Sequence, residues 1–202
     1  MNGSVHEGFY LAHAALENFV RDSLEESYKK NPNKPVFITG HSLGGAIGHI
    51  AMYTLLTEKK MGFKINLKAI YTFGAPRVGN KEFGIDYSQK AKEFGVGIYN
   101  IANESDLVTH VPCVHYNHVG AKIFMSRLAV GGDGSTKAVY KPIKLNKESL
   151  FINPDSCGYA SMVKNVFSLK AMLSEHKMAT YVDRLSDLRN QLRDQKVSCD
   201  KK

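Results

Sequence analysis

The chain has 202 residues, of which 43% are hydrophobic and 23% are charged, and its formal net charge is +8 at pH 7. This is an ordinary composition for a globular protein, and the length suits one domain spanning residues 1–202. The Lys and Arg residues are scattered without an aromatic-interleaved basic stripe, which argues against a nucleic-acid partner. No apolar run reaches the roughly 18 residues of a membrane-spanning helix, so we expect no transmembrane segment.

The cysteines and the first residues bear on the compartment. Cys113, Cys157 and Cys199 are odd in number and widely spaced, which is a poor disulfide framework and suggests a reducing compartment or thiols without a structural role. The opening residues have neither the basic nor the apolar region of a secretory signal. A cytoplasmic location is therefore favoured, and a secreted form stays open if the natural N-terminus lies upstream of Met1.

The first predicted element is a long helix. Apolar residues recur three and four positions apart from Phe9 to Tyr28, and the pattern stops before Asn31. We expect this helix to cover one face of a sheet. His13, within it, is expected at the surface rather than in a ligand site.

The segment Pro35–Ala46 predicts a buried strand that runs into a serine and then a helix. Gly40, Ser42 and Gly44 fit the pattern G-x-S-x-G, with His41 before the serine. In such a nucleophile elbow the serine takes strained backbone angles, and the glycines two before and two after it avoid a collision. Ser42 is thus the predicted nucleophile. The alternative is a glycine-rich helix start with a capping serine.

Two further strands are predicted at Leu67–Phe73 and Gly97–Asn103, with a helical stretch through Ser88–Phe94 between them. Asp106 follows the third strand directly. A carboxylate there could hold a catalytic imidazole in its useful tautomer and stabilise the cation that forms. Glu104 is the competing acid, and the alternative for Asp106 is an aspartate that caps a turn.

A cluster of possible metal ligands comes next. His110, Cys113, His115 and His118 have a spacing that superficially suits zinc, and a metal-dependent hydrolase is a third possibility. Alternate residues of an extended segment point to opposite faces, so His115 and His118 would not readily converge. We therefore predict no metal and no cofactor.

The last third of the chain contributes the predicted base. Helices are predicted at Ser161–Leu173 and Met178–Gln195, a short edge strand at Val139–Leu145, and a flexible tail at 197–202. His176 lies between the two helices. It completes the order Ser, Asp, His that α/β-hydrolases use. The alternative is an unremarkable histidine after a helix.

Several segments resemble the class 3, or fungal-type, lipase family of α/β-hydrolases. The specific motifs are GHSLGGA at 40–46 and TFGAPRVGN at 72–80, and the supporting segments are 5–9, 103–112 and 176–185. The resemblance implies an α/β fold with a mostly parallel sheet and helices on both faces. It makes Tyr116–Phe124 an outer strand with His118 structural. For Arg77 it leaves open a structural ion pair or a role toward substrate.

The resemblance also implies an activity. A lipase-type carboxylic ester hydrolase would use Ser42, Asp106 and His176 to form an acyl-enzyme, and the backbone N–H of Leu43 would donate to the oxyanion. Its partner would be a lipid or other ester, with transient contact to a lipid surface. The alternatives are a phospholipase A1, a general carboxylesterase, and a truncated or pseudoenzyme lipase-like binding module. The oligomeric state stays open.

The family's second oxyanion donor and its lid lie upstream of the stretch that resembles residues 5–9. We therefore expect this chain to lack the early strands, the oxyanion strand and the lid. One lost oxyanion donor commonly lowers the rate by about a hundred- to a thousandfold. The expectation is a weakened enzyme without strong interfacial activation.

Overall fold

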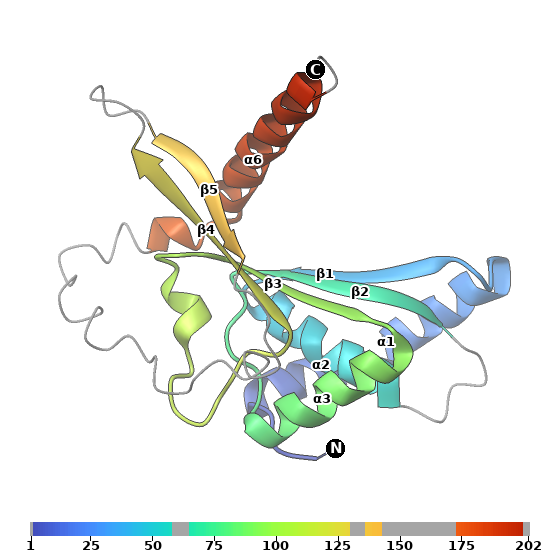
Figure 1. Ribbon diagram of the computed structural model, residues 1–202. Helices are drawn as coiled ribbons and strands as arrows, with labels where there is room; N and C mark the ends of the chain where they lie inside the picture. The colour runs from blue at the N-terminus through green and yellow to red at the C-terminus, as the bar shows by residue number, and fades with distance from the viewer. Residues whose placement is uncertain (1, 58–64, 130–135, 143–172, 200–202) are drawn as a thin grey trace.

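The computed structural model describes residues 2–57, 65–129, 136–142 and 173–199, without the side chains of 126–129, 136–142 and 194–199. These ranges contain a five-stranded sheet in the order β1-β2-β3-β4-β5 (Figure 1). The strands are β1 (Pro35–His41), β2 (Asn66–Phe73), β3 (Gly97–Asn103), β4 (Ala121–Ala129) and β5 (Thr136–Pro142). Neighbours from β1 to β4 are parallel, and β5 is an antiparallel edge strand.

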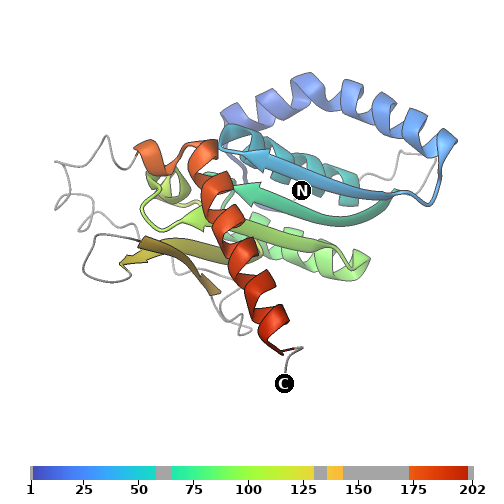
Figure 2. The same cartoon turned by 90° about the horizontal axis from the view of Figure 1, so that it is seen from above.

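Helices lie on both sides of this sheet, as predicted. They are α1 (Glu7–Lys30), α2 (Leu43–Thr57), α3 (Lys81–Phe94) and α6 (Met178–Cys199), with a short 3-10 helix η1 (Leu107–His110). Figures 1 and 2 show α1, α2 and α3 on one side of the sheet and α6 crossing the other. The carboxyl ends of the parallel strands thus meet at one edge, where side chains from different strands can converge.

Helix α1 has the predicted extent but not the predicted partner. It packs mainly against α2 rather than covering a face of the sheet. His13, expected at the surface, is only 5% exposed because it faces α2, and burial lowers its pKa. Phe19, counted in the apolar stripe, is 73% exposed. The stripe therefore located the helix correctly but misassigned its buried side.

The main core lies between the sheet and helices α2 and α3. The glycines near the start of α2 allow close contact, since a Cβ at Gly48 would lie 3.2 Å from Ile38 Cγ2. A second cluster packs β3 and β4 against α6; its buried members are Ile101, Met125 and Tyr181. Completely burying a side chain of this size contributes about 1.5–3 kcal/mol. These two clusters fix α2 and α6, which flank the edge where the strands end.

Other boundaries differ from the sequence predictions. Strand β4 begins at Ala121 rather than Tyr116, because Gly120 takes a positive φ of 83° just before it. It is an outer strand, as expected, with the edge strand β5 paired beyond it. The predicted edge strand exists, but at Thr136–Pro142.

The structure describes one of the two helices predicted near the C-terminus. Helix α6 runs from Met178 to Cys199, which is longer than the predicted helix Met178–Gln195. The predicted helix at 161–173 lies outside the described residues except at its last position. Within the described ranges, none of the helices combines the length and the apolar character needed to cross a membrane.

Candidate active site

The structure contains the predicted succession of a strand, a tight turn at Ser42 and a helix. Strand β1 ends at His41, helix α2 begins at Leu43, and Ser42 joins them with φ 56°. The Ser42 N–H donates to the Phe73 carbonyl at 3.0 Å, which ties the turn to β2. A left-handed serine is strained by about 1–3 kcal/mol, and such strain clusters at functional sites. The turn therefore lifts the Ser42 side chain above the end of the sheet.

The glycine requirement in this turn is shifted by one residue. A Cβ at Gly40 would lie 2.4 Å from the Gly44 carbonyl oxygen, so Gly40 is needed as predicted. Among the described residues, a Cβ at Gly44 would meet nothing within 4 Å, so the prediction for Gly44 is wrong. The close approach occurs at Gly45, where a Cβ would lie 2.7 Å from Ala75 Cβ because α2 packs onto the end of β2 there.

Ser42, Asp106 and His176 come together from three separate segments. His176 Nε2 lies 2.8 Å from Ser42 Oγ, and its Nδ1 lies 2.9 Å from Asp106 Oδ2 and 3.1 Å from Oδ1. Asp106 is fully buried, and the His176 side chain is 19% exposed. A carboxylate can only accept, so Nδ1 carries the hydrogen and Nε2 is free to accept from the serine hydroxyl. This is the relay that acyl transfer needs.

Asp106 also caps a turn, which was the alternative interpretation of it from the sequence. Its Oδ1 accepts from the Val108 N–H at 2.9 Å at the start of η1. Its Oδ2 accepts from the Tyr181 hydroxyl at 2.7 Å. These two hydrogen bonds fix the plane of the carboxylate beside His176. Glu104, the competing acid in the sequence analysis, is exposed on the preceding turn, whereas Asp106 is buried and contacts His176.

Tyr181 is a site residue that the sequence analysis did not single out. It is completely buried, and its hydroxyl accepts from the Asn103 N–H at 3.0 Å, which directs its own proton to Asp106. Burial, with the neighbouring Asp106 charge, raises the pKa of Tyr181 far above its ordinary value. The signal that could have found it is the segment His-x-x-x-x-Tyr that begins at His176.

Gly74 lies directly against the side chains of Asp106, His176 and Tyr181. It takes φ +60° directly after β2, and its Cβ would lie 2.8 Å from Asp106 Oδ2. The same atom would lie 3.1 Å from both His176 Nδ1 and the Tyr181 hydroxyl. Any side chain here would enter the hydrogen bond between acid and base.

The sequence model of the class 3 lipases matches residues 1–116, more than half of the chain. The chain belongs to the class 3 lipase family. With this parallel sheet and its helices, that places it in the α/β-hydrolase superfamily.

Known lipases and a known phospholipase are similar to this chain over part of their length. A lipase of Rhizomucor miehei is 28% identical over 124 residues, covering 60% of this chain and 33% of that protein. The chloroplastic phospholipase A(1) DAD1 of Arabidopsis thaliana is 33% identical over 126 residues, which cover 56% of this chain and 26% of that protein. A solved triacylglycerol lipase with a serine protease triad at its catalytic centre aligns with a TM-score of 0.57 at 25% identity. The alignment covers 76% of this chain and 53% of that lipase. This chain thus spans a third or less of these curated relatives.

In this class 3 lipase chain, Arg77 holds the loop that follows the acid. It is 4% exposed, and its Nη1 donates to the carbonyls of Cys113 at 3.2 Å and Tyr116 at 3.5 Å. Burial lowers its pKa. These two hydrogen bonds to backbone carbonyls support a structural role for Arg77.

Two histidines of the histidine-rich stretch, His110 and His118, stabilise the same loop after Asp106. The buried His118 donates from Nε2 to the Thr109 carbonyl at 2.6 Å, and burial keeps its pKa well below the ordinary value. The His110 ring donates from Nδ1 to the Asp106 carbonyl at 3.0 Å. His118 is therefore structural, as predicted. Among the residues that the structure describes, no group of three or more His, Cys, Asp and Glu could hold a metal ion.

Cys113 overturns the cysteine prediction, because it is disulfide-bonded. An odd number of cysteines leaves one unpaired but does not prevent two from pairing. Disulfides persist in oxidising compartments, so the cysteine argument for a reducing compartment fails.

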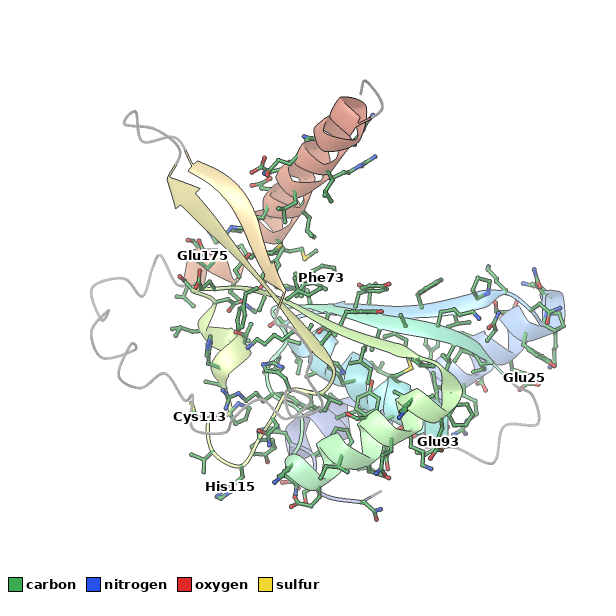
Figure 3. All side chains as sticks on the ribbon, in the orientation of Figure 1. Glu25, Phe73, Glu93, Cys113, His115 and Glu175 are labelled. Atoms are coloured by element: carbon green, nitrogen blue, oxygen red, sulfur yellow. The ribbon has the colours of Figure 1, made fainter. Side chains whose placement is uncertain are left out.

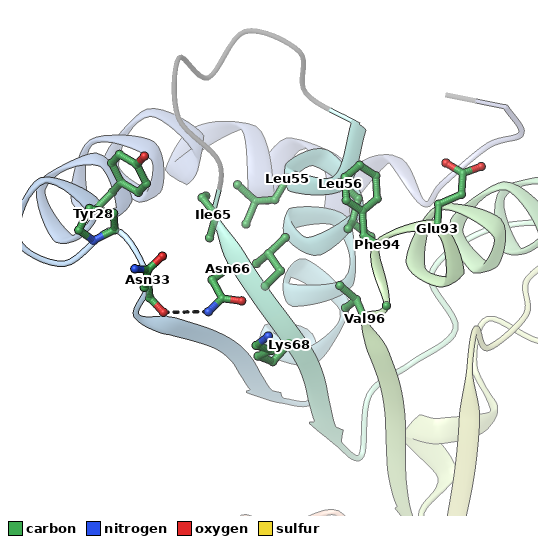
Figure 4. A pocket seen from close by; sticks show the side chains of 13 residues that line it. Tyr28, Asn33, Leu55, Leu56, Ile65, Asn66, Lys68, Glu93, Phe94 and Val96 are labelled. Atoms are coloured by element: carbon green, nitrogen blue, oxygen red, sulfur yellow. Dashed lines mark hydrogen bonds between the residues drawn. The ribbon is translucent and has the colours of Figure 1, made fainter.

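A pocket of about 790 Å³ lies at the opposite end of the strands (Figure 4). Its lining includes Tyr28, Leu56, Lys68 and Phe94 but none of the three triad residues. Figure 3 shows Glu175, beside His176, far from Glu93, which lines that pocket. The described pocket is therefore separate from the triad.

Proposed function

We propose that the protein is a carboxylic ester hydrolase of lipase type that cleaves acylglycerols or related lipid esters. The observation that carries the proposal is the continuous hydrogen-bonded chain from Ser42 Oγ through His176 to Asp106. A binding module would have no need of this arrangement, which positions and activates a nucleophile.

The reaction follows from the donor and acceptor roles. Ser42 Oγ attacks the ester carbonyl carbon while its proton moves to His176 Nε2. The buried Asp106 carboxylate stabilises the imidazolium that forms. The proton then passes to the leaving alcohol oxygen as the carbon–oxygen bond breaks, which leaves an acyl group on Ser42. Water, activated by the same imidazole, releases the acid and restores the serine.

The tetrahedral intermediate needs donors for its oxyanion. The Leu43 N–H is the first of helix α2, where backbone N–H groups have no intrahelical acceptor and the helix dipole favours negative charge. It also directly follows the nucleophile in sequence, which is the position that donates in a nucleophile elbow. We assign Leu43 N–H as one oxyanion donor.

Exposed apolar side chains next to the triad in sequence support a lipid substrate. Leu43 is 50% exposed beside Ser42, and Leu173 is 56% and Met178 is 40% exposed on either side of His176. Apolar side chains that stay in water at such positions suit contact with acyl chains or a lipid surface. A phospholipase A1 activity is the second candidate, favoured by the similarity to DAD1 and by the net charge of +8.

The proposal predicts that a fluorophosphonate probe labels Ser42 and no other serine. Labelling requires an activated nucleophile, so it should fall at least a hundredfold in rate in His176→Ala, where the base is absent. The intact mass of the protein over time measures the labelling rate, and peptide mapping identifies the labelled serine. An unlabelled protein, or a His176→Ala variant labelled as fast as the wild type, would refute the proposal.

A further inference from the structure

The backbone around His176 is held by side chains that reach it from the sheet. His176 lies in the short turn between the helical residues 173–175 and α6. Local hydrogen bonds there involve Ser174, which accepts from the Lys177 N–H at 3.2 Å and from the Thr180 hydroxyl at 2.8 Å. None of these bonds fixes the distance from His176 to Ser42. That distance depends on contacts between the turn and the strands.

Two strands supply those contacts through residues that adjoin the other triad members. Asn103 Nδ2, at the end of β3, donates to the Glu175 carbonyl at 2.6 Å. His41 Nε2, at the end of β1, donates to the His176 carbonyl at 2.7 Å. His41 directly precedes Ser42, and Asn103 is three residues before Asp106. The strands that present the nucleophile and the acid therefore each hold one of two consecutive carbonyls at the base.

The His41 ring makes a second contact with the base. Its centroid lies 4.8 Å from that of His176, with 31° between the ring planes. The rings of His41 and Tyr181 meet edge to face with centroids 5.9 Å apart, so the partly buried His41 ring contacts two rings of the site. A carbonyl only accepts, so His41 carries its hydrogen on Nε2. The His41 ring can thus support the His176 imidazole both by packing and by its hydrogen bond.

The Asn103 and Glu175 side chains complete the attachment. Asn103 is completely buried, and its amide is committed to the turn by the bond to Glu175. The Glu175 carboxylate pairs with Arg184 of α6 at 2.6 Å, where the Arg184 side chain is 6% exposed. Arg184 also donates to the Met125 carbonyl of β4 at 3.3 Å. The turn is thus attached to β1, β3 and β4.

We propose that His41 and Asn103 are positioning residues for the general base, an inference that rests on the proposed hydrolase function. By holding the Glu175 and His176 carbonyls, they keep Nε2 within hydrogen-bond reach of Ser42 Oγ. A misplacement of about 1 Å in a reacting group can lower a rate by about a hundredfold. Their loss should therefore lower kcat and leave KM nearly unchanged, because neither residue is assigned to substrate binding.

The test compares His41→Phe, which keeps a ring but has no donor, with His41→Gln, which keeps a donor of similar reach. We expect kcat for p-nitrophenyl butyrate to fall about 10- to 100-fold in His41→Phe, with KM within about twofold. His41→Gln should recover kcat to within about threefold of wild type. His115→Gln, the same change at an exposed histidine, is the control. Asn103→Ala, which removes the hydrogen bond from β3, should lower kcat as much as His41→Phe and leave KM nearly unchanged.

A second readout needs no turnover. The proton on His176 Nδ1, which is bonded to Asp106, should give a downfield resonance in the proton NMR spectrum of the wild type and of His41→Gln. In His41→Phe this proton should exchange with solvent fast enough for the resonance to disappear. If the wild type were inactive but this signal behaved as expected, positioning would stand and the hydrolase proposal would fall. The positioning inference is overturned if His41→Phe keeps both kcat and the signal, or if His41→Gln loses as much as His41→Phe.

Discussion

Replacing Asp106 by asparagine should lower kcat by a factor on the order of 10⁴. Asp106 accepts from three donors, namely the Val108 N–H, the Tyr181 hydroxyl and His176 Nδ1. An asparagine has one acceptor oxygen and one NH₂ group, so its NH₂ must face at least one of these donors. The His176 ring would then be displaced or would carry its proton on Nε2, where it could not accept from Ser42. Steady-state kinetics with a soluble ester measure the loss.

The chain offers a matched control for this change. Asp86 on α3 also accepts from a tyrosine, Tyr53, and from the Asn2 N–H, but it is not part of the triad. Asp86→Asn should keep kcat within about twofold, whatever it does to the melting temperature. A similar loss in both variants would mean that Asp106 acts on stability rather than on the base.

Gly74→Ala should cost at least a hundredfold in kcat while the protein still folds. The new methyl group would lie 2.8 Å from Asp106 Oδ2 and 3.1 Å from His176 Nδ1, closer than ordinary contacts allow. Acid and base would have to separate, and a displacement of about 1 Å in a reacting group can cost about a hundredfold. Kinetics and thermal unfolding of the same preparation separate the effect on rate from the effect on stability.

Gly95 supplies the control for the backbone part of that effect. It has φ +66° at the end of α3, close to the +60° of Gly74, but a Cβ there would meet nothing within 4 Å. A left-handed alanine costs about 1–2 kcal/mol at either position. Gly95→Ala should therefore lower stability by a similar amount and leave kcat within about twofold. Equal kcat in the two variants would contradict the placement of Gly74 beneath the triad.

Local patterns, together with the resemblance to the class 3 lipases, predicted the fold and the three residues that the structure brings together. The apolar run before Ser42, with Gly40, specified the strand and the turn. Asp106 was expected because a carboxylate directly after a strand lies at the edge where the nucleophile also lies. The chain order then selected His176.

The features that sequence reasoning missed depend on contacts between distant residues. His13 faces α2 because of how two helices pack, which the spacing of apolar residues in one helix does not determine. Tyr181 and Asn103 belong to the site through bonds across more than 70 residues. Gly45 is tight only because β2 passes beneath α2. Periodicity within one element carries no information about such contacts.

The most direct test of the whole account is the hydrolysis of p-nitrophenyl butyrate by this 202-residue chain beside its Ser42→Ala variant. The account predicts turnover in the wild type that falls to the buffer background in the variant, because no other described residue takes the place of the nucleophile. Turnover that survives in Ser42→Ala would contradict the assignment of Ser42. A folded wild type without turnover would contradict the hydrolase function itself.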